Sequence, residues 1–280
     1  MIFKFDQFVN EDSNPNDPWK KYGYKNKSRA EKLEMTKEEA LDKYAPWYDW
    51  ENCETKMYRM VDADSAVRFI DPKKHKRGPR HSPVLYQLFI DEWKGWPNRS
   101  ESVICSTKDY GLSVYGKNLY RVIPIKENSL VAFTPSSDIW SSFGVGLWTV
   151  DNKLNVRSLD IDSLTKKLVD YYYAGDAPKD LSLDDFKKRC QEIDIEKNPI
   201  VKSKFDQAGH KWFDTKEDLL RFKRNYPNGF YDVLDEIIDP MGSKYIGEFQ
   251  LLEYNNETTI DRDSRTECWT DQPCLMIKVG

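Results

Sequence analysis

The sequence has few residues of the kinds that build metal and disulfide sites. Its five cysteines (Cys53, Cys105, Cys190, Cys268 and Cys274) are scattered, with no Cys-x-x-Cys pair, and it has only three histidines. An odd, dispersed set of cysteines argues against a disulfide framework, and the missing ligand spacing argues against zinc. We therefore expect no metal site and no histidine-based hydrolysis.

Long apolar runs and an excess of positive charge are also missing. Lys4 and Asp6 interrupt the apolar start, and no apolar stretch approaches the length of a signal peptide or a membrane span. The formal net charge is −4, so no overall basic field attracts nucleic acid. These features predict a cytoplasmic protein with no membrane partner.

Aromatic residues, in contrast, are abundant. The 280 residues include nine Trp and sixteen Tyr, and 39% of the chain is hydrophobic, which is enough for a sizeable core. Aromatic side chains bury much area each and often line clefts, so a ligand pocket is a reasonable expectation.

The order of patterns along the chain predicts an α+β fold. An arm and helices are expected over residues 1–54, and strand candidates such as "KMYRMV" and "LYRVIPI" over 55–157. Helical patterns fill 158–240, and strands return over 241–280. We expect the late strands to complete the sheet that the early strands begin, with 158–240 as a helical insertion.

Two sequence features support the helices. The apolar residues of "VLYQLFIDEWKGW" have helical spacing, at Val84, Leu85, Leu88, Phe89 and Trp93. "SLDD" and "TKED" each begin with a hydroxyl residue followed by acids, as helix N-termini prefer.

The stretch "GWPNRSESVICSTKDYGLSVYG" places two hydroxyls, Ser106 and Thr107, directly after an apolar strand and before a second one. One interpretation is a corner built for packing, in which a hydroxyl caps a short helix. The other is that the hydroxyls face a ligand.

Three separated pieces carry a family resemblance. Tyr58-Arg59 lies in an early strand, Ser106-Thr107 follows "SVIC", and Glu267 lies in "RTECWTDQPCLMI". An aromatic-basic pair, a Ser-Thr step and a late glutamate, in this order, resemble the ADP-ribosyltransferase superfamily over roughly residues 55–145 and 245–280. The resemblance implies a split antiparallel sheet that clamps NAD, which is a substrate.

The resemblance also implies residue roles. Glu267 would be the catalytic acid that stabilises the ribose cation as nicotinamide leaves. Arg59, Ser106, Thr107 and Tyr115 would bind NAD. Each residue has a plainer interpretation as well: Arg59 as a surface residue, the hydroxyls as caps, and Glu267 as a polar member of an alternating strand.

One departure from the family pattern concerns the acceptor. Arginine-modifying relatives carry an acid or amide two residues before the glutamate, where this chain has Arg265. The acceptor is therefore expected to be a host nucleic acid or another protein side chain. Segments such as "RSESVICST" are also similar to phage-encoded proteins, which suggests a phage effector acting in the host cytoplasm.

Some features remain open between functions. The basic loop from Lys73 to His81 is either a solvated loop or a grip on a pyrophosphate or nucleic-acid backbone. The alternative to an enzyme is a phage interaction or structural protein that keeps the fold without its chemistry. Convergence of Arg59, Ser106 and Glu267 on one cleft distinguishes the two.

Overall fold

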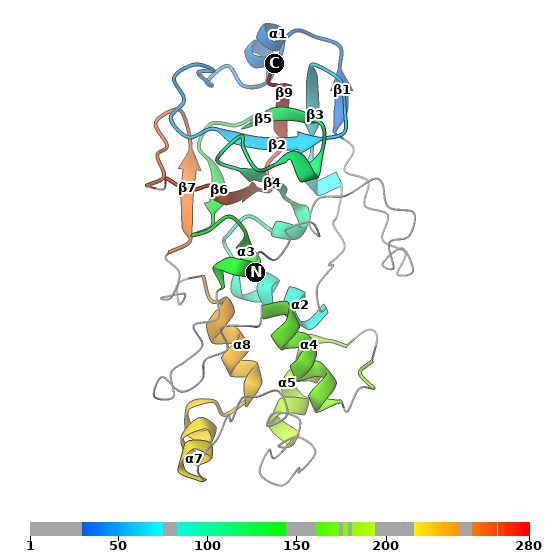
Figure 1. Ribbon diagram of the computed structural model, residues 1–280, viewed down its shortest axis with the longest axis vertical. Coiled ribbons are helices and arrows are strands. Elements are labelled where there is room, and N and C mark those ends of the chain that lie inside the picture. Colours follow the sequence, from blue (N-terminus) through cyan, green and yellow to red (C-terminus); the bar gives the residue numbers. More distant parts are fainter. Residues whose placement is uncertain are drawn as a thin grey trace. The chain divides into compact units, whose positions relative to one another are not determined.

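The computed structural model describes residues 30–74, 83–143, 161–173, 176–178, 181–193, 216–240, 248–261 and 263–280. These residues form two compact units (Figure 1). The first takes its described residues from 1–80, 95–139 and 249–280, and the second from 81–94 and 140–248. Residues 144–157, the last part of the range expected to hold strands, lie outside the described residues, as do the loop residues 75–82 and all three histidines.

The first unit is built on one antiparallel sheet, which makes the fold α+β as expected. The strands that the structure describes are paired in the order β1-β3-β9-β5-β2-β4-β8-β6-β7. Their bounds are β1 (Glu31–Leu33), β2 (Met57–Val61), β3 (Val67–Ile70), β4 (Val103–Ser106), β5 (Asn118–Pro124), β6 (Ser129–Phe133), β7 (Gln250–Tyr254), β8 (Glu267–Thr270) and β9 (Cys274–Lys278).

The late strands complete the sheet, which confirms the predicted pairing of early with late segments. β9 pairs with β3 and β5, and β8 pairs with β4 and β6. All four residues of β8 and the first four of β9 are buried, so both strands belong to the core. Helix α1 (Lys37–Tyr44) packs against β9.

The segment before α1 differs from the prediction. We expected one or two helices from residue 28 to near Pro46, but Glu31–Leu33 forms β1 at the sheet edge, paired with β3. The helix begins later because Thr36 caps it in a complete capping box with Glu39. A three-residue strand depends on its partner in the sheet, and a local pattern rich in helix formers does not reveal that partner.

Strands β2 and β4 are joined by one residue pair, Tyr58 with Ser106. The neighbouring join of β2 to β5 extends over five pairs, from Met57–Val122 to Val61–Asn118. The pairing is therefore sparse at the centre of the sheet, between the group β1-β3-β9-β5-β2 and the group β4-β8-β6-β7.

The second unit is helical. It contains α2 (Pro83–Glu92), α4 (Ile161–Tyr172), α5 (Leu183–Glu192), α7 (Lys216–Asn225) and α8 (Phe230–Ile238), and the short α3 (Ile139–Ser142) lies at the boundary between the units. Our domain prediction placed α2 in the core of residues 55–157, whereas the structure groups it with these helices. No helix among the described residues is long and apolar enough to cross a membrane.

Helices α2 and α8 form the centre of this unit. The predicted apolar face of α2 is confirmed, because Val84, Leu85, Leu88, Phe89 and Trp93 are all buried. The Trp93 indole Nε1 donates to the Ile238 carbonyl at 2.7 Å, which fixes the end of α8 to α2. The predicted cap of α5 is also present, since the Ser182 hydroxyl accepts from the Asp185 amide at 3.1 Å.

Carboxylates gather between α2 and α8. Burial, a hydrogen bond with Asp235 and the nearby charges of Asp235, Asp239 and Asp91 raise the pKa of Glu92 from its ordinary 4.5 to about 7. Burial also raises the pKa of Asp235. Near neutral pH the negative form of Glu92 is therefore costly to the folded helical unit.

We predict that the helical unit loses stability as the pH rises from about 4.5 to about 7. Between these values the folded state binds more protons than the unfolded state, so the free energy of unfolding falls with pH. Glu92→Gln should flatten this dependence, as measured by urea unfolding followed by helical circular dichroism. Glu217→Gln, at an exposed position of α7, is the matched control and should keep the wild-type slope. An unchanged slope in Glu92→Gln would contradict the assignment.

Candidate functional site

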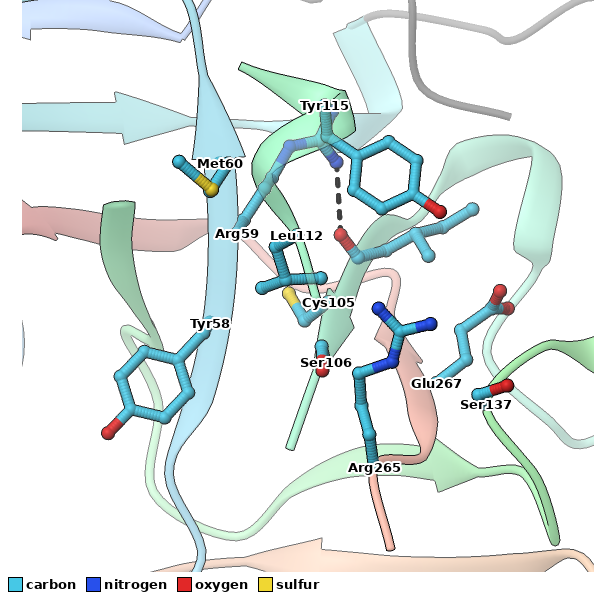
Figure 2. Close-up of a pocket in the computed structure, with 11 residues that line it drawn as sticks. Tyr58, Arg59, Met60, Cys105, Ser106, Leu112, Tyr115, Ser137, Arg265 and Glu267 are labelled. Carbon is cyan, nitrogen blue, oxygen red and sulfur yellow. Dashed lines mark hydrogen bonds between the residues drawn. The ribbon is translucent and has the colours of Figure 1, made fainter. Parts of the chain in front are cut away.

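A pocket lies at the sparse join of β2 and β4 (Figure 2). It brings together four of the five residues singled out from the sequence: Arg59, Ser106, Tyr115 and Glu267. The other described residues that line it are Tyr58, Met60, Ile104, Cys105, Leu112, Ser137 and Arg265. Residues far apart in the sequence therefore converge on one site.

The sheet register places these residues on neighbouring strands. Tyr58 pairs with Ser106, and Ser106 pairs in turn with Glu267, so the three positions form one row across β2, β4 and β8. Arg59 follows Tyr58 on β2, and Figure 2 shows their side chains on opposite sides of the strand. Arg59 extends toward Tyr115, whereas the Tyr58 ring points away toward Arg121, at 5.9 Å.

Arg59 is buried rather than on the surface. Only 4% of it is exposed, and its Nη1 donates to the Ile104 carbonyl at 3.1 Å. This bond fixes the guanidinium beside β4, where a planar donor with several N–H groups suits a phosphate or ribose. The plainer interpretation of Arg59, a solvated strand residue, is wrong.

Glu267 is held through its backbone and its side chain. Its amide donates to the Thr134 hydroxyl at 3.0 Å and to the Ser136 carbonyl at 3.2 Å, which fixes the start of β8. Only 3% of the side chain is exposed, and its carboxylate lies 2.6 Å from the Arg99 guanidinium. Glu267 is therefore a buried carboxylate with a buried counter-charge.

The two hydroxyls close turns. Ser106 Oγ donates to the Lys108 carbonyl at 2.9 Å and accepts from the Lys108 amide at 3.2 Å. Thr107 Oγ1 lies 3.2 Å from the Thr266 hydroxyl and accepts from the Thr266 amide at 3.1 Å. The expected helix at this point is absent, because the next helical turn is η4 (Ser113–Tyr115), and Thr107 is not among the residues that line the pocket.

Residues 108–116 form a strap that covers one side of the pocket. Leu112 and Tyr115 contribute its apolar wall. The strap is tied in the middle by Arg265, whose Nη1 donates to the Gly111 carbonyl at 2.6 Å. Its far end must be glycine, since a Cβ on Gly116 would lie 2.5 Å from the Val61 backbone. Tyr115 is therefore placed by packing against β2 and by η4.

Positive charge predominates around the pocket. Arg59 and Arg265 line it, and the acid among the described lining residues, Glu267, is already matched by Arg99. An anionic group is therefore the charge type that fits, although the whole chain carries a net charge of −4. Burial raises the pKa of the Cys268 thiol, with a further contribution from a hydrogen bond with Cys105, so Cys268 is a poor nucleophile.

Sequence reasoning missed Arg99 and Trp269. Arg99 begins a short turn, η3 (Arg99–Glu101), and lies over the Trp269 ring at 5.4 Å. The weak signal for Arg99 was an arginine in a Pro-Asn turn just before an apolar strand. Its partner is close in space but distant in sequence, so no local pattern identifies the pair.

Other features contribute less. Asp138 lies next to Ser137 of the pocket, and its carbonyl accepts from the Ser136 hydroxyl at 3.0 Å. Residues 75–81 of the basic loop lie outside the described residues. Within the described ranges, no group of three or more His, Cys, Asp or Glu is placed to hold a metal ion.

We predict that Ser106→Ala lowers the free energy of unfolding by about 1 kcal/mol, because a buried turn loses its side-chain hydrogen bonds. Urea unfolding measures this change. Ser137→Ala removes an exposed hydroxyl from the same pocket and should leave stability unchanged. Equal stability of the two variants would show that the Ser106 turn contributes nothing.

Comparison with known proteins adds no assignment to this geometry. No protein-family model matches the chain, and no curated protein or solved structure matches it either.

Proposed function

We propose that the pocket binds NAD and that the chain is an ADP-ribosyltransferase with Glu267 as its catalytic acid. The observation that supports this most directly is the placement of Arg59, Ser106 and Glu267 on adjacent strands around one pocket. A basic, a hydroxyl and an acidic residue in this chain order are what the superfamily uses.

The sheet is consistent with the proposal. In an ADP-ribosyltransferase, the antiparallel sheet is split where NAD binds. Here the single pair between β2 and β4 is the place where such a split would lie, and the pocket adjoins it. The part of the helical unit from residue 140 to 248, which lies between β6 and β7 in the chain, would then be the insertion.

The proposed chemistry is a transfer of ADP-ribose. The bond between nicotinamide and ribose breaks, its electron pair leaves with nicotinamide, and positive charge develops on the ribose. A fixed carboxylate stabilises that charge mainly in the transition state. The acceptor nucleophile then bonds to the same ribose carbon and loses its proton to solvent.

The chain's own residues would divide the binding. Arg59 and Arg265 would bind the phosphates or the ribose, because their guanidinium groups offer several N–H donors to oxygen anions. Tyr115 and Leu112 would pack against a ring. Ser106 and Thr107 would act through the turn that they close, keeping β4 and β8 in register.

Arg265 indicates which kind of acceptor fits the site. A cationic side chain two residues before Glu267 disfavours a cationic arginine acceptor by like-charge repulsion. We propose a host nucleic acid or another protein side chain, as a phage effector would modify. Arg265 lines the pocket beside Glu267 (Figure 2), so it is placed to meet an anionic acceptor.

A non-catalytic interaction protein is the second candidate. Two contacts favour an interaction protein. The Ser106 hydroxyl is hydrogen-bonded within the protein, and the Glu267 carboxylate is paired with Arg99. The same contacts would hold a fold together without any reaction.

We expect the wild-type protein to release nicotinamide from NAD, and Glu267→Gln to reduce the rate about 100-fold or more per folded molecule. The amide keeps the size of the side chain, so NAD should still bind in calorimetry. Nicotinamide release is measured with DNA, RNA or cell lysate as acceptor.

Glu253→Gln is the matched control, because Glu253 is an exposed acid on β7, outside the pocket. It should release nicotinamide at the wild-type rate. Absence of both release and NAD binding in the wild type would favour the interaction protein. Equal release by wild type and Glu267→Gln would remove Glu267 from the mechanism.

A further inference from the structure

The contact between Arg99 and Glu267 is a closely spaced ion pair between two buried side chains. Arg99 Nη1 lies 2.6 Å from Glu267 Oε1, and the two side chains are 4% and 3% exposed. A buried charge is stabilised by an opposite charge close to it, so each of these groups favours the charged form of the other.

The loop that carries Arg99 is built to hold it in place. The Asn98 side chain accepts from the Ser100 amide at 3.0 Å, and the Ser102 hydroxyl donates to the Asn98 carbonyl at 2.6 Å. The Trp269 indole donates to the Pro97 carbonyl at 2.9 Å. The two Asn98 bonds fix the turn around Arg99, and the Trp269 bond fixes the start of the loop to β8.

Trp269 and Glu267 both contact the Arg99 guanidinium, Trp269 with its ring face and Glu267 with its carboxylate. They are two residues apart on β8, so their side chains leave the same face of the strand. Arg99 lies over the indole ring at 5.4 Å while it contacts the carboxylate. The ring face attracts the cation and restricts its orientation.

Arg99 influences the pocket through Glu267. Glu267 is among the described residues that line the pocket, and Arg99 is not. Glu267 therefore connects Arg99 to the pocket wall, and the position and charge of its buried carboxylate depend on the guanidinium beside it.

We propose that Arg99 is the positioning residue of this site: it keeps Glu267 ionised and fixes the direction of its carboxylate in the wall of the pocket. Its role in a reaction depends on the function proposed above, but its control of Glu267 does not. Loss of the Arg99 charge leaves a buried carboxylate that takes up a proton at a higher pH.

Other groups near the pocket also bear on the charge of Glu267. Among the described residues, the charged or titratable side chains that line the pocket or neighbour Glu267 on β8 are Tyr58 and Arg59 on β2, Cys105 on β4, Tyr115 in η4, Arg265 and Cys268. None of them changes in an Arg99 variant, so a shift in that variant reports the loss of Arg99.

The first experiment needs no NAD. The full chain is labelled with isotope-enriched glutamate, and the Glu267 carboxyl signal is identified by its loss in Glu267→Gln. In Arg99→Gln the midpoint of this signal's titration should rise by about one pH unit or more relative to wild type. An unchanged midpoint in folded Arg99→Gln would overturn the proposal.

Arg121→Gln is the matched control. Arg121 is also a buried arginine that lies over an aromatic ring, that of Trp50 at 4.0 Å, but it does not line the pocket or pair with Glu267. The Glu267 titration should be the same in this variant as in wild type. An equal shift in both arginine variants would attribute the effect to general loosening and would overturn the proposal.

A stability measurement covers the case in which Arg99→Gln folds poorly. The double variant Arg99→Gln with Glu267→Gln removes both charges, so its melting temperature should exceed that of Arg99→Gln alone. A melting temperature of the double variant equal to or below that of Arg99→Gln would show that loss of Arg99 places no cost on the Glu267 carboxylate, and would contradict the proposal.

Enzymatic assays then separate this inference from the proposed function. Where the wild type releases nicotinamide, Arg99→Gln should lower kcat about tenfold or more with little change in KM, and should move the acid limb of the pH profile upward. Where the wild type releases none, the proposed function fails, while the titration and melting results still decide the role of Arg99.

Discussion

The single residue pair between β2 and β4 is the constraint around which the first unit is arranged. Tyr58 and Ser106 hold two groups of strands in one sheet, and the pairing goes no further. The backbone of β2 beyond this pair therefore has no partner in β4, and the pocket lies here, with Arg59 on one side and Glu267 on the other. A longer ladder at this join would bring the strands together along their length and leave less room for a ligand.

Charge burial is the second constraint. Arg59, Arg99, Arg121 and Glu267 are all buried, and each has its charge or its N–H groups met by a specific partner: a carbonyl, a carboxylate or an aromatic ring. Such contacts contribute less to stability than apolar packing of the same volume would. Their concentration at and near the pocket is typical of a site that needs charge in a defined place.

The sequence predicted the elements better than it predicted the contacts of the site. Periodicity gave the strands near Arg59 and Glu267 and the buried face of α2, because these patterns are local. The order of basic, hydroxyl and acidic residues also pointed to the pocket. The strand β1, the turn at Ser106 and the pairing of Arg99 with Glu267 were not predicted, because each depends on a neighbour in space or on competition between two local turns. The residue type shows which contacts a side chain is able to make. Which contact it makes depends on its neighbours in the fold, and a local sequence pattern does not reveal them.

The position of β8 and β9 in the sheet has a consequence for synthesis of the protein. On the ribosome, the early strands β2 to β6 emerge long before β8 and β9, which pair with some of them in the sheet. Residues 140–248 of the helical unit are translated in the interval. During translation, the strand edges that later pair with β8 and β9 have no partner in the nascent chain. Exposed strand edges favour aggregation, and a chaperone that binds them would prevent it. The same delay means that Glu267 meets Arg99 and the pocket only after β8 has left the exit tunnel. The site is therefore assembled late, because it depends on one of the last two described strands of the sheet to be translated.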